Sequence, residues 1–270
     1  MGRVTSALVV AHRGSSGAHA EHTLAAYELA IEEGADALEC DVRLTRDGVL
    51  VCVHDRTVDR TSDGRGVVST LELADLAELD FASWKASQGD RLLEADWDLL
   101  DRDRTRVLTL ERLLRLVLDH DRPVQLHVET KHPTRYGGLV ERALVELLAR
   151  YRLDRPLTRS VSRVTVMSFA ATSLRRIHAL APSLPTVLLM DRIPVRLRDG
   201  TLPARVQIAG PSLAALRRDP GYVERVHAAG HRVHVWTVDQ AADISFVLGL
   251  GVDAVISNHP RRVLSRLGRT

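Results

Sequence analysis

The sequence predicts an α/β protein folded as a (β/α)8 TIM barrel, with a small insertion after the second strand. Three observations predict this fold. Short apolar runs typical of buried strands alternate with helical patterns, which favours a parallel sheet. Roughly eight strand–helix units are present, and that number favours closure into a barrel. The sequence contains neither a G-x-G-x-x-G nor a Walker motif, which weakens the nucleotide-binding alternatives.

The strand–helix pattern is clear from the start of the chain. Residues 7–11 are a continuous apolar run, as expected of a buried strand. Thr23 suits the N-cap of a helix that runs to about residue 33, and Gly34 suits its C-terminus. A second strand is predicted at 37–44, and a polar turn returns the chain as a strand at 49–53.

Residues 56–106 interrupt the pattern, because they are too many for an ordinary strand–helix connection. Ser69 with Glu72 resembles a capping box that opens a helix over residues 71–79. We therefore expect an insertion of loops and short helices. Its aromatic rings either fasten it to the body or form a wall or lid over a site; these are Phe81, Trp84 and Trp97.

The alternation resumes after the insertion and continues to the end of the chain. Helical patterns are predicted at 110–118, 139–150, 170–180, 222–229 and 241–248, and from residue 260 onward. Apolar strand candidates separate them at 124–128, 164–167, 186–190, 205–209, 232–235 and 254–256. We expect residues 1–270 to form one barrel domain.

Composition excludes several classes of protein. The 37 Lys and Arg residues are interleaved with 35 Asp and Glu residues, giving a net charge of +2, so no nucleic-acid partner is expected. No apolar stretch approaches the ~20 residues that span a bilayer, so no stable membrane insertion is expected. The run at 7–11 is too short for the apolar part of a signal peptide, which favours a cytoplasmic protein. The oligomeric state stays open.

Two carboxylates share one face of the second strand. Glu39 and Asp41 are two residues apart, so their side chains point the same way. Two buried carboxylates repel each other and are costly to desolvate, and a hard cation between them removes both problems. Glu129 and Lys131 form a similar pair near the strand at 124–128. With Glu129 as a third ligand, the sequence predicts a site for one divalent ion, Mg²⁺ or Ca²⁺.

Other polar residues also follow predicted strands, where barrel active sites form. His12 and Arg13 follow the first strand, His54 ends the return strand, and Trp236 and Asn258 follow late strands. Taken singly, each has an ordinary structural explanation, such as a surface ion pair or a turn. Their joint placement favours a site.

His127 shares a face with Glu129 and is a candidate to line the barrel. We expect it to be a hydrogen-bonded interior residue rather than a metal ligand. Glu21 and Trp236 are further candidates to line the site.

Several motifs together resemble the glycerophosphodiester phosphodiesterase family. In order, they are AHRG at 11–14, E-x-T at 21–23, GAD-x-x-E-x-DV at 34–42, T-x-DG at 45–48 and HD at 54–55. The run V-E-T-K at 128–131 resembles that family's E-x-K strand, and V-W-T-V at 235–238 resembles a late strand. The insertion also falls where the family carries one.

This resemblance implies a TIM barrel that uses a divalent metal to hydrolyse glycerophosphodiesters to glycerol 3-phosphate and an alcohol. It implies that His12 and His54 are the general acid/base pair and that Arg13 and Lys131 contact the phosphate. It also implies that the metal is held by Glu39, Asp41 and Glu129.

The chain departs from the family pattern at two positions. His22 stands where the family usually has Asn, and its role is open. Asn258 stands where an Asp is usual, so a carboxylate is expected to be missing from the barrel mouth.

Three alternatives stay open. The first is a lysophospholipase D-like activity on the same fold, which would need a groove for an acyl chain, and 56–106 is where we would expect it. The second is an aldolase-type barrel with Lys131 as a Schiff-base lysine. The third is a non-catalytic phosphate-ligand binding barrel, against which the presence of both His12 and His54 argues.

Overall fold

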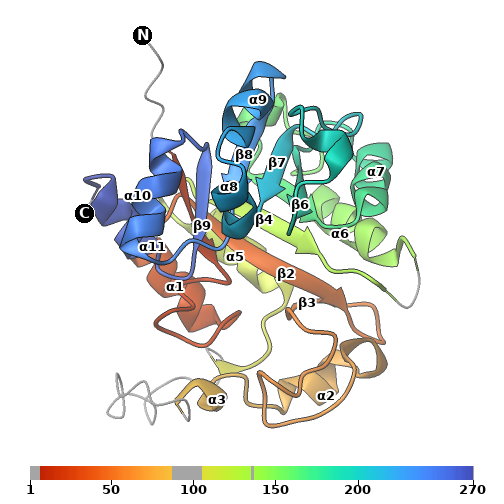
Figure 1. Cartoon of the computed structure of the whole chain (residues 1–270). Helices are drawn as coiled ribbons and strands as arrows, with labels where there is room; N and C mark the ends of the chain where they lie inside the picture. Colours follow the sequence, from red (N-terminus) through yellow and green to blue (C-terminus); the bar gives the residue numbers. More distant parts are fainter. Residues whose placement is uncertain (1–6, 87–104, 135–136, 270) are drawn as a thin grey trace.

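The predicted barrel is confirmed. A computed structural model describes residues 7–86, 105–134 and 137–269. The strands run in the order β1-β9-β8-β7-β6-β5-β4-β2-β3, and β1 also pairs with β2, which closes the barrel (Figure 1). Among the named strands of the described residues, β3 alone is antiparallel to its neighbour. The strands are β1 (Leu8–His12), β2 (Ala37–Leu44), β3 (Leu50–Cys52), β4 (Gln125–Thr130), β5 (Val164–Ser168), β6 (Thr186–Met190), β7 (Ile208–Pro211), β8 (Arg232–Val235) and β9 (Ala254–Ser257).

Helices surround the barrel (Figure 1). Among the described residues, none of them is both long enough and apolar enough to cross a membrane. The helices that follow or precede barrel strands are α1 (Leu24–Glu32), α5 (Leu110–Asp119), α6 (Leu139–Arg150), α7 (Ala171–Leu180), α8 (Leu213–Arg218), α9 (Tyr222–Ala228), α10 (Ala241–Gly249) and α11 (Pro260–Arg266). Short 3-10 turns lie at η3 (Arg159–Val161) and η4 (Val195–Leu197).

The strands are buried on both faces, and β2 shows how the two faces differ. Leu38, Cys40 and Val42 pack outward against the helices in one large apolar cluster. Ala37 belongs instead to the cluster inside the barrel. Because side chains alternate along a strand, Glu39 and Asp41 also point into the barrel. The inward face of β2 therefore carries both an apolar residue and two carboxylates.

The described residues between β3 and α5 lie beside the barrel. They include η1 (Val68–Thr70), α2 (Leu73–Ala77) and α3 (Ser83–Ala86), and Figure 1 shows α2 and α3 outside the ring of helices. Val58, Val68 and Leu76 of this region form an apolar cluster with Val51 of β3. Trp97 lies outside the described residues.

The predicted capping box in this region was wrong by one turn. Ser69 lies inside η1, and α2 begins after Glu72 rather than at Ser69. The observed capping box pairs Glu72 with Asp75, whose side chain accepts from the Glu72 backbone at 2.9 Å. The Glu72 carboxylate, like a serine hydroxyl, can offer an oxygen to the free N–H groups of the first turn.

Two other boundaries differ from the prediction. β4 continues to Thr130, so Glu129 lies within the strand and not after it. The strand predicted at 205–209 begins only at Ile208, because Arg205 adopts a left-handed conformation with φ 74°. α8 was not predicted; Ser212 caps it by accepting from Ala215 N at 3.1 Å.

Candidate active site

Three carboxylates meet inside the barrel. Parallel pairing of β2 with β4 sets Asp41 beside Glu129, and Glu39 precedes Asp41 on the same face. One oxygen of each lies within 4.8 Å of the others. Their exposed fractions are 2%, 1% and 7% for Glu39, Asp41 and Glu129. The structure thus brings together the three residues predicted to hold a metal.

The three acids differ in charge. Burial raises the pKa of Glu129 to about 8, and the charge of Asp41 adds to this rise. Burial beside Asp41 also raises the pKa of Glu39 well above its usual value. Burial acts the same way on Asp41, but a hydrogen bond from His22 and the charges of Arg13 and Lys131 overcome it and hold its pKa well below normal. Without an added cation, the cluster cannot easily carry three negative charges.

The two basic residues predicted to bind phosphate border this cluster. Lys131 Nζ lies 2.9 Å from Glu129 Oε1 and 3.3 Å from Asp41 Oδ1. Arg13 forms a 3.0 Å ion pair with Asp41 through Nε and another with Glu21 through Nη1. Both cations therefore lie at the rim of the acids, where an anionic ligand would meet them.

His12 is oriented by a residue that sequence reasoning did not assign. Its Nδ1 lies 2.7 Å from Asn258 Oδ1, and because that oxygen can only accept, Nδ1 donates. Asn258 donates in turn to Asp239, from Nδ2 at 2.7 Å and from its backbone at 2.8 Å. Burial, with the charge of Arg13, lowers the pKa of His12 to about 4.

Position 258 carries an amide where the family usually has Asp, and a carboxylate from elsewhere in the chain lies beside it. Asp239, in the loop after β8, supplies the carboxylate near the barrel mouth, and Asn258 connects it to His12. The only sequence signal for it was its position shortly after the V-W-T-V run.

His54 has a matching arrangement on the side of the inserted region. Its Nδ1 lies 2.7 Å from Asp55 Oδ1. Arg60 holds Asp55 at 2.6 Å and also donates to both oxygens of Glu21, at 2.7 and 3.0 Å. Burial alone would raise the pKa of Glu21 and of Asp55, but these hydrogen bonds help to lower both pKa values to about 2. The sequence analysis assigned no role to Arg60.

Arg60 thus connects the inserted region to both sides of the site. Glu21, which it holds, contacts Arg13, while Asp55 contacts His54. Its guanidinium also lies 5.9 Å from the centre of the Trp84 ring. Trp84 therefore packs, within the inserted region, on the arginine that contacts both sides of the site.

His22 contacts the acid cluster directly. Its Nε2 lies 3.0 Å from Asp41 Oδ2, and its Nδ1 lies 2.8 Å from the Tyr27 hydroxyl. The same hydroxyl lies 3.1 Å from the Glu39 carbonyl oxygen, to which it donates. The φ of 62° at His22 is one that Asn also tolerates well. His in place of the family's usual Asn therefore suits the same backbone conformation, and its two ring nitrogens contact Asp41 and Tyr27.

Below the site, His127 stacks on His234. The ring centres are 5.3 Å apart and the planes differ by 5°. His127 is fully buried, as expected, but in the described part of the chain none of the four ring nitrogens has a hydrogen-bond partner. The expectation that His127 is hydrogen-bonded is therefore wrong. Strands β4 and β8 face each other across the barrel, and stacking replaces the hydrogen bond.

Trp236 forms an apolar wall at the barrel mouth. Its Nε1 donates to the Gly210 carbonyl at 2.7 Å, which fixes the indole. Phe169 meets it edge-on, with ring centres 5.3 Å apart, and is 42% exposed. Such a pair offers a surface for the carbon skeleton of a ligand.

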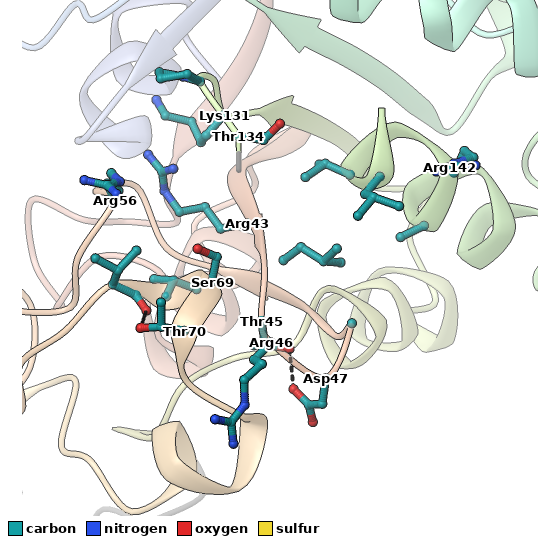
Figure 2. A pocket seen from close by; sticks show the side chains of 18 of the residues that line it. Arg43, Thr45, Arg46, Asp47, Arg56, Ser69, Thr70, Lys131, Thr134 and Arg142 are labelled. Carbon is teal, nitrogen blue, oxygen red and sulfur yellow. Dashed lines mark hydrogen bonds between the residues drawn. The ribbon is translucent and has the colours of Figure 1, made fainter. Parts of the chain in front are cut away.

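A groove with a volume of about 1240 Å³ opens beside Lys131. It lies between the β2–β3 turn, η1 of the inserted region and the start of α6. Figure 2 shows Lys131, Arg43 and Arg56 gathered at one end of it and Arg142 on the other side. Arg43 also donates to the His54 carbonyl at 2.7 and 3.0 Å, so this end adjoins the site.

The chain is similar to known phosphodiesterases along almost its whole length. Residues 12–262 match the glycerophosphoryl diester phosphodiesterase family. The chain is 50% identical to Probable glycerophosphodiester phosphodiesterase 1 of Mycobacterium tuberculosis, over 94% of this chain and 90% of that protein. It is 33% identical to a glycerophosphodiester phosphodiesterase of Bacillus subtilis, over 94% and 84% respectively.

A solved structure agrees with this similarity. It is an Oleispira antarctica phosphodiesterase in complex with the product sn-glycerol-3-phosphate, which superposes with a TM-score of 0.81. It is 27% identical, and the match covers 97% of this chain and 96% of that one. The chain therefore belongs to the glycerophosphoryl diester phosphodiesterase family and is a phosphoric diester hydrolase.

Proposed function

We propose that the protein hydrolyses glycerophosphodiesters to glycerol 3-phosphate and an alcohol, with His12 and His54 as the general acid/base pair. The matched arrangement of the two imidazoles carries this proposal, since each donates its Nδ1 hydrogen to a fixed oxygen at 2.7 Å. With Nδ1 occupied in both rings, Nε2 is the atom that each presents for proton transfer.

The acid cluster suits one divalent cation, Mg²⁺ or Ca²⁺, held by Glu39, Asp41 and Glu129. Burial and mutual repulsion raise the pKa of Glu39 and Glu129. Such shifts are expected where the negative charge of the carboxylates exceeds the positive charge of the neighbouring basic side chains. Carboxylate oxygens are the ligands that these ions prefer. Once bound, such an ion would polarise a phosphate oxygen and neutralise charge.

The protein's own groups have distinct tasks in this reaction. Arg13 and Lys131 bind the anionic phosphate and stabilise the charge that moves as the P–O bond to the alcohol breaks. One imidazole accepts the proton of the attacking hydroxyl through Nε2. The other donates a proton to the departing alkoxide, which leaves as the alcohol. Over the full reaction one water is consumed, and the broken P–O bond is replaced by a P–OH bond.

The aldolase alternative is disfavoured by the state of Lys131. Burial on its own lowers the pKa of this amine, but the charges of Asp41 and Glu129 outweigh it and the pKa is raised. A Schiff-base lysine needs the neutral amine as its nucleophile. An ammonium ion held between two carboxylates suits phosphate binding instead.

The test is release of glycerol 3-phosphate from glycerophosphocholine and glycerophosphoethanolamine, with Mg²⁺, with Ca²⁺ and with EDTA. We expect release that depends on the metal and is abolished in His12→Ala and His54→Ala. His120→Ala, at an exposed position, serves as the control and should retain full activity. Full activity in the double variant of His12 and His54 would refute the acid/base assignment. No release with any metal would favour the lysophospholipase D-like alternative first, and the phosphate-binding alternative if a lysophospholipid also failed to react.

A further inference from the structure

We propose that the groove beside Lys131 binds an apolar chain carried by one of the two alcohols of the diester. Single-chain amphiphilic phosphodiesters would then be better substrates than compact ones such as glycerophosphocholine. This proposal deepens the proposed function and rests on it. The groove lies outside the proposed catalytic groups, and its shape and lining indicate the substrate class.

The groove shares Lys131 with the predicted phosphate site. Lys131 contacts Asp41 and Glu129 on one side and lines the groove on the other. Arg43, at the same end, holds the backbone of His54. A phosphate bound by Lys131 would therefore direct one of its two substituents past His54 and into the groove.

The middle of the groove is apolar. Leu44 of β2, Val68 of η1 and three residues of α6 line it, namely Leu139, Val140 and Ala143. Leu44, Leu139 and Ala143 remain only partly buried in the described structure. These side chains come from three separate elements and face a common space, and Figure 2 shows apolar side chains between the basic cluster and Arg142. Burying a chain here would remove apolar surface from water on both partners.

The charges of the groove indicate an anionic ligand. Its lining includes five basic residues, Arg43, Arg46, Arg56, Lys131 and Arg142, against two acidic ones, Asp47 and Glu146. Three of the basic side chains meet at the end next to the site (Figure 2). A phosphate group at that end with an uncharged chain beyond it matches this distribution. A neutral apolar ligand would make no use of the positive charge at the basic end.

The size of the groove also exceeds what a compact diester needs. Its volume of about 1240 Å³ is larger than the roughly 300–1,000 Å³ typical of pockets for drug-sized ligands. A small headgroup would occupy only the basic end and leave the apolar part in water. A chain of several methylenes would cover it.

Binding of alkyl phosphates tests the groove without requiring turnover. We would titrate ethyl, butyl, hexyl, octyl and decyl phosphate into the Mg²⁺-loaded protein by calorimetry, below the concentrations at which micelles form. We expect affinity to rise about two- to fourfold per added methylene until the groove is filled. Affinity that does not change with chain length would overturn the proposal.

Two groove variants and a control identify where the chain lies. Ala143→Trp fills the groove with an indole, and Leu139→Asp places a charge in it at a helix first turn, where an acid is tolerated. Each should reduce the ratio of decyl to ethyl affinity at least tenfold. Ala149→Trp, on the exposed face of the same helix, should leave that ratio unchanged. Equal behaviour of Ala143→Trp, Leu139→Asp and Ala149→Trp would also overturn the proposal.

A kinetic series separates this proposal from the proposed function. Glycerophosphocholine reports the reaction itself, while a lysophosphatidylcholine and a glycerophosphoalkanol carry the chain on the glycerol and on the alcohol respectively. A higher kcat/KM for one of the two, lost in Ala143→Trp, would show which alcohol carries the chain. If glycerophosphocholine and both chain substrates fail to react, the proposed function fails, whereas the alkyl phosphate series still decides the groove.

Discussion

The stacked histidines inside the barrel should make the fold sensitive to acid. Burial, with a smaller effect of Arg232, lowers the pKa of His127 from its ordinary value of 6.5 to about 4. Burial and the neighbouring His127 lower the pKa of His234 as well. The unfolded chain therefore binds protons in a pH range where the folded barrel does not. Stability should fall as the pH drops through 6.5, and this contribution should level off below about 4.

The size of the effect follows from these values. Each tenfold change in proton affinity corresponds to about 1.36 kcal/mol, so a fall of the pKa from 6.5 to about 4 corresponds to about 3.4 kcal/mol for His127, a limit reached only below about pH 4, where the folded and the unfolded states are both protonated. Between pH 8 and pH 5 the same two values give a loss of about 2 kcal/mol. This is a large share of the roughly 5–15 kcal/mol that stabilises a typical protein.

The variant His127→Leu isolates this contribution. Equilibrium urea unfolding, followed by far-ultraviolet circular dichroism in EDTA at pH 8, 6.5 and 5, gives the free energy of unfolding at each pH. We expect the loss of stability between pH 8 and pH 5 to be smaller in His127→Leu than in the wild type by about 2 kcal/mol. Because a difference across pH is compared, any constant cost of repacking the core cancels.

The exposed His120→Gln variant is the matched control and should keep the wild-type dependence on pH. An equal dependence in His127→Leu and the wild type would refute the reasoning. It would mean that the His127 ring is solvated or hydrogen-bonded in the folded protein, so that burial does not change its proton affinity.

Three further predictions concern the site. His22→Ala removes the contact between His22 and Asp41 and should weaken Mg²⁺ or Ca²⁺ binding by about 10- to 100-fold, whereas His22→Asn should largely retain the affinity. Calorimetric titration measures both, and equal affinities in the wild type and His22→Ala would contradict the role of the Asp41 contact. His54→Ala should lower kcat by about a hundredfold to ten-thousandfold while metal affinity stays unchanged, so a parallel loss of metal binding would instead make His54 part of the metal site. Arg60→Ala should lower kcat by about ten- to a hundredfold, because it releases Asp55 and Glu21 from their fixed positions. Arg60→Lys should restore only part of the activity. Kinetics indistinguishable from the wild type in both variants would show that Arg60 only fastens the insertion.

Local periodicity was enough to predict part of the site. Glu39 and Asp41 share a face in any strand, so their common direction needed only the recognition of β2. The convergence of Glu129 with them required one more step, the rule that barrel strands are parallel and place their ends together. The register that sets Asp41 beside Glu129 could not be read from either strand alone.

Other contacts depend on residues far apart in the chain. His12 and Asn258 are separated by 246 positions, and no local pattern connects them. The same holds for His127 and His234, which meet only because β4 and β8 face each other across a closed barrel. The capping box at Glu72 was missed for a different reason, since an acidic N-cap and a serine N-cap are close alternatives in sequence.

The sequence by itself determined the class of fold, the faces of the strands and the kind of chemistry. The fold class follows from the number of strand–helix units, and the faces of the strands follow from the alternation of side chains, which is a local property. The kind of chemistry follows from the preferences of carboxylates and from the motifs that resemble a known family. Only the tertiary structure decided which residues orient the two imidazoles, how the acid cluster is charged and where the groove lies. Each of these depends on the distances between strands and loops, which closure of the barrel sets. Each also depends on burial, because a side chain is buried only when segments from elsewhere in the chain pack around it.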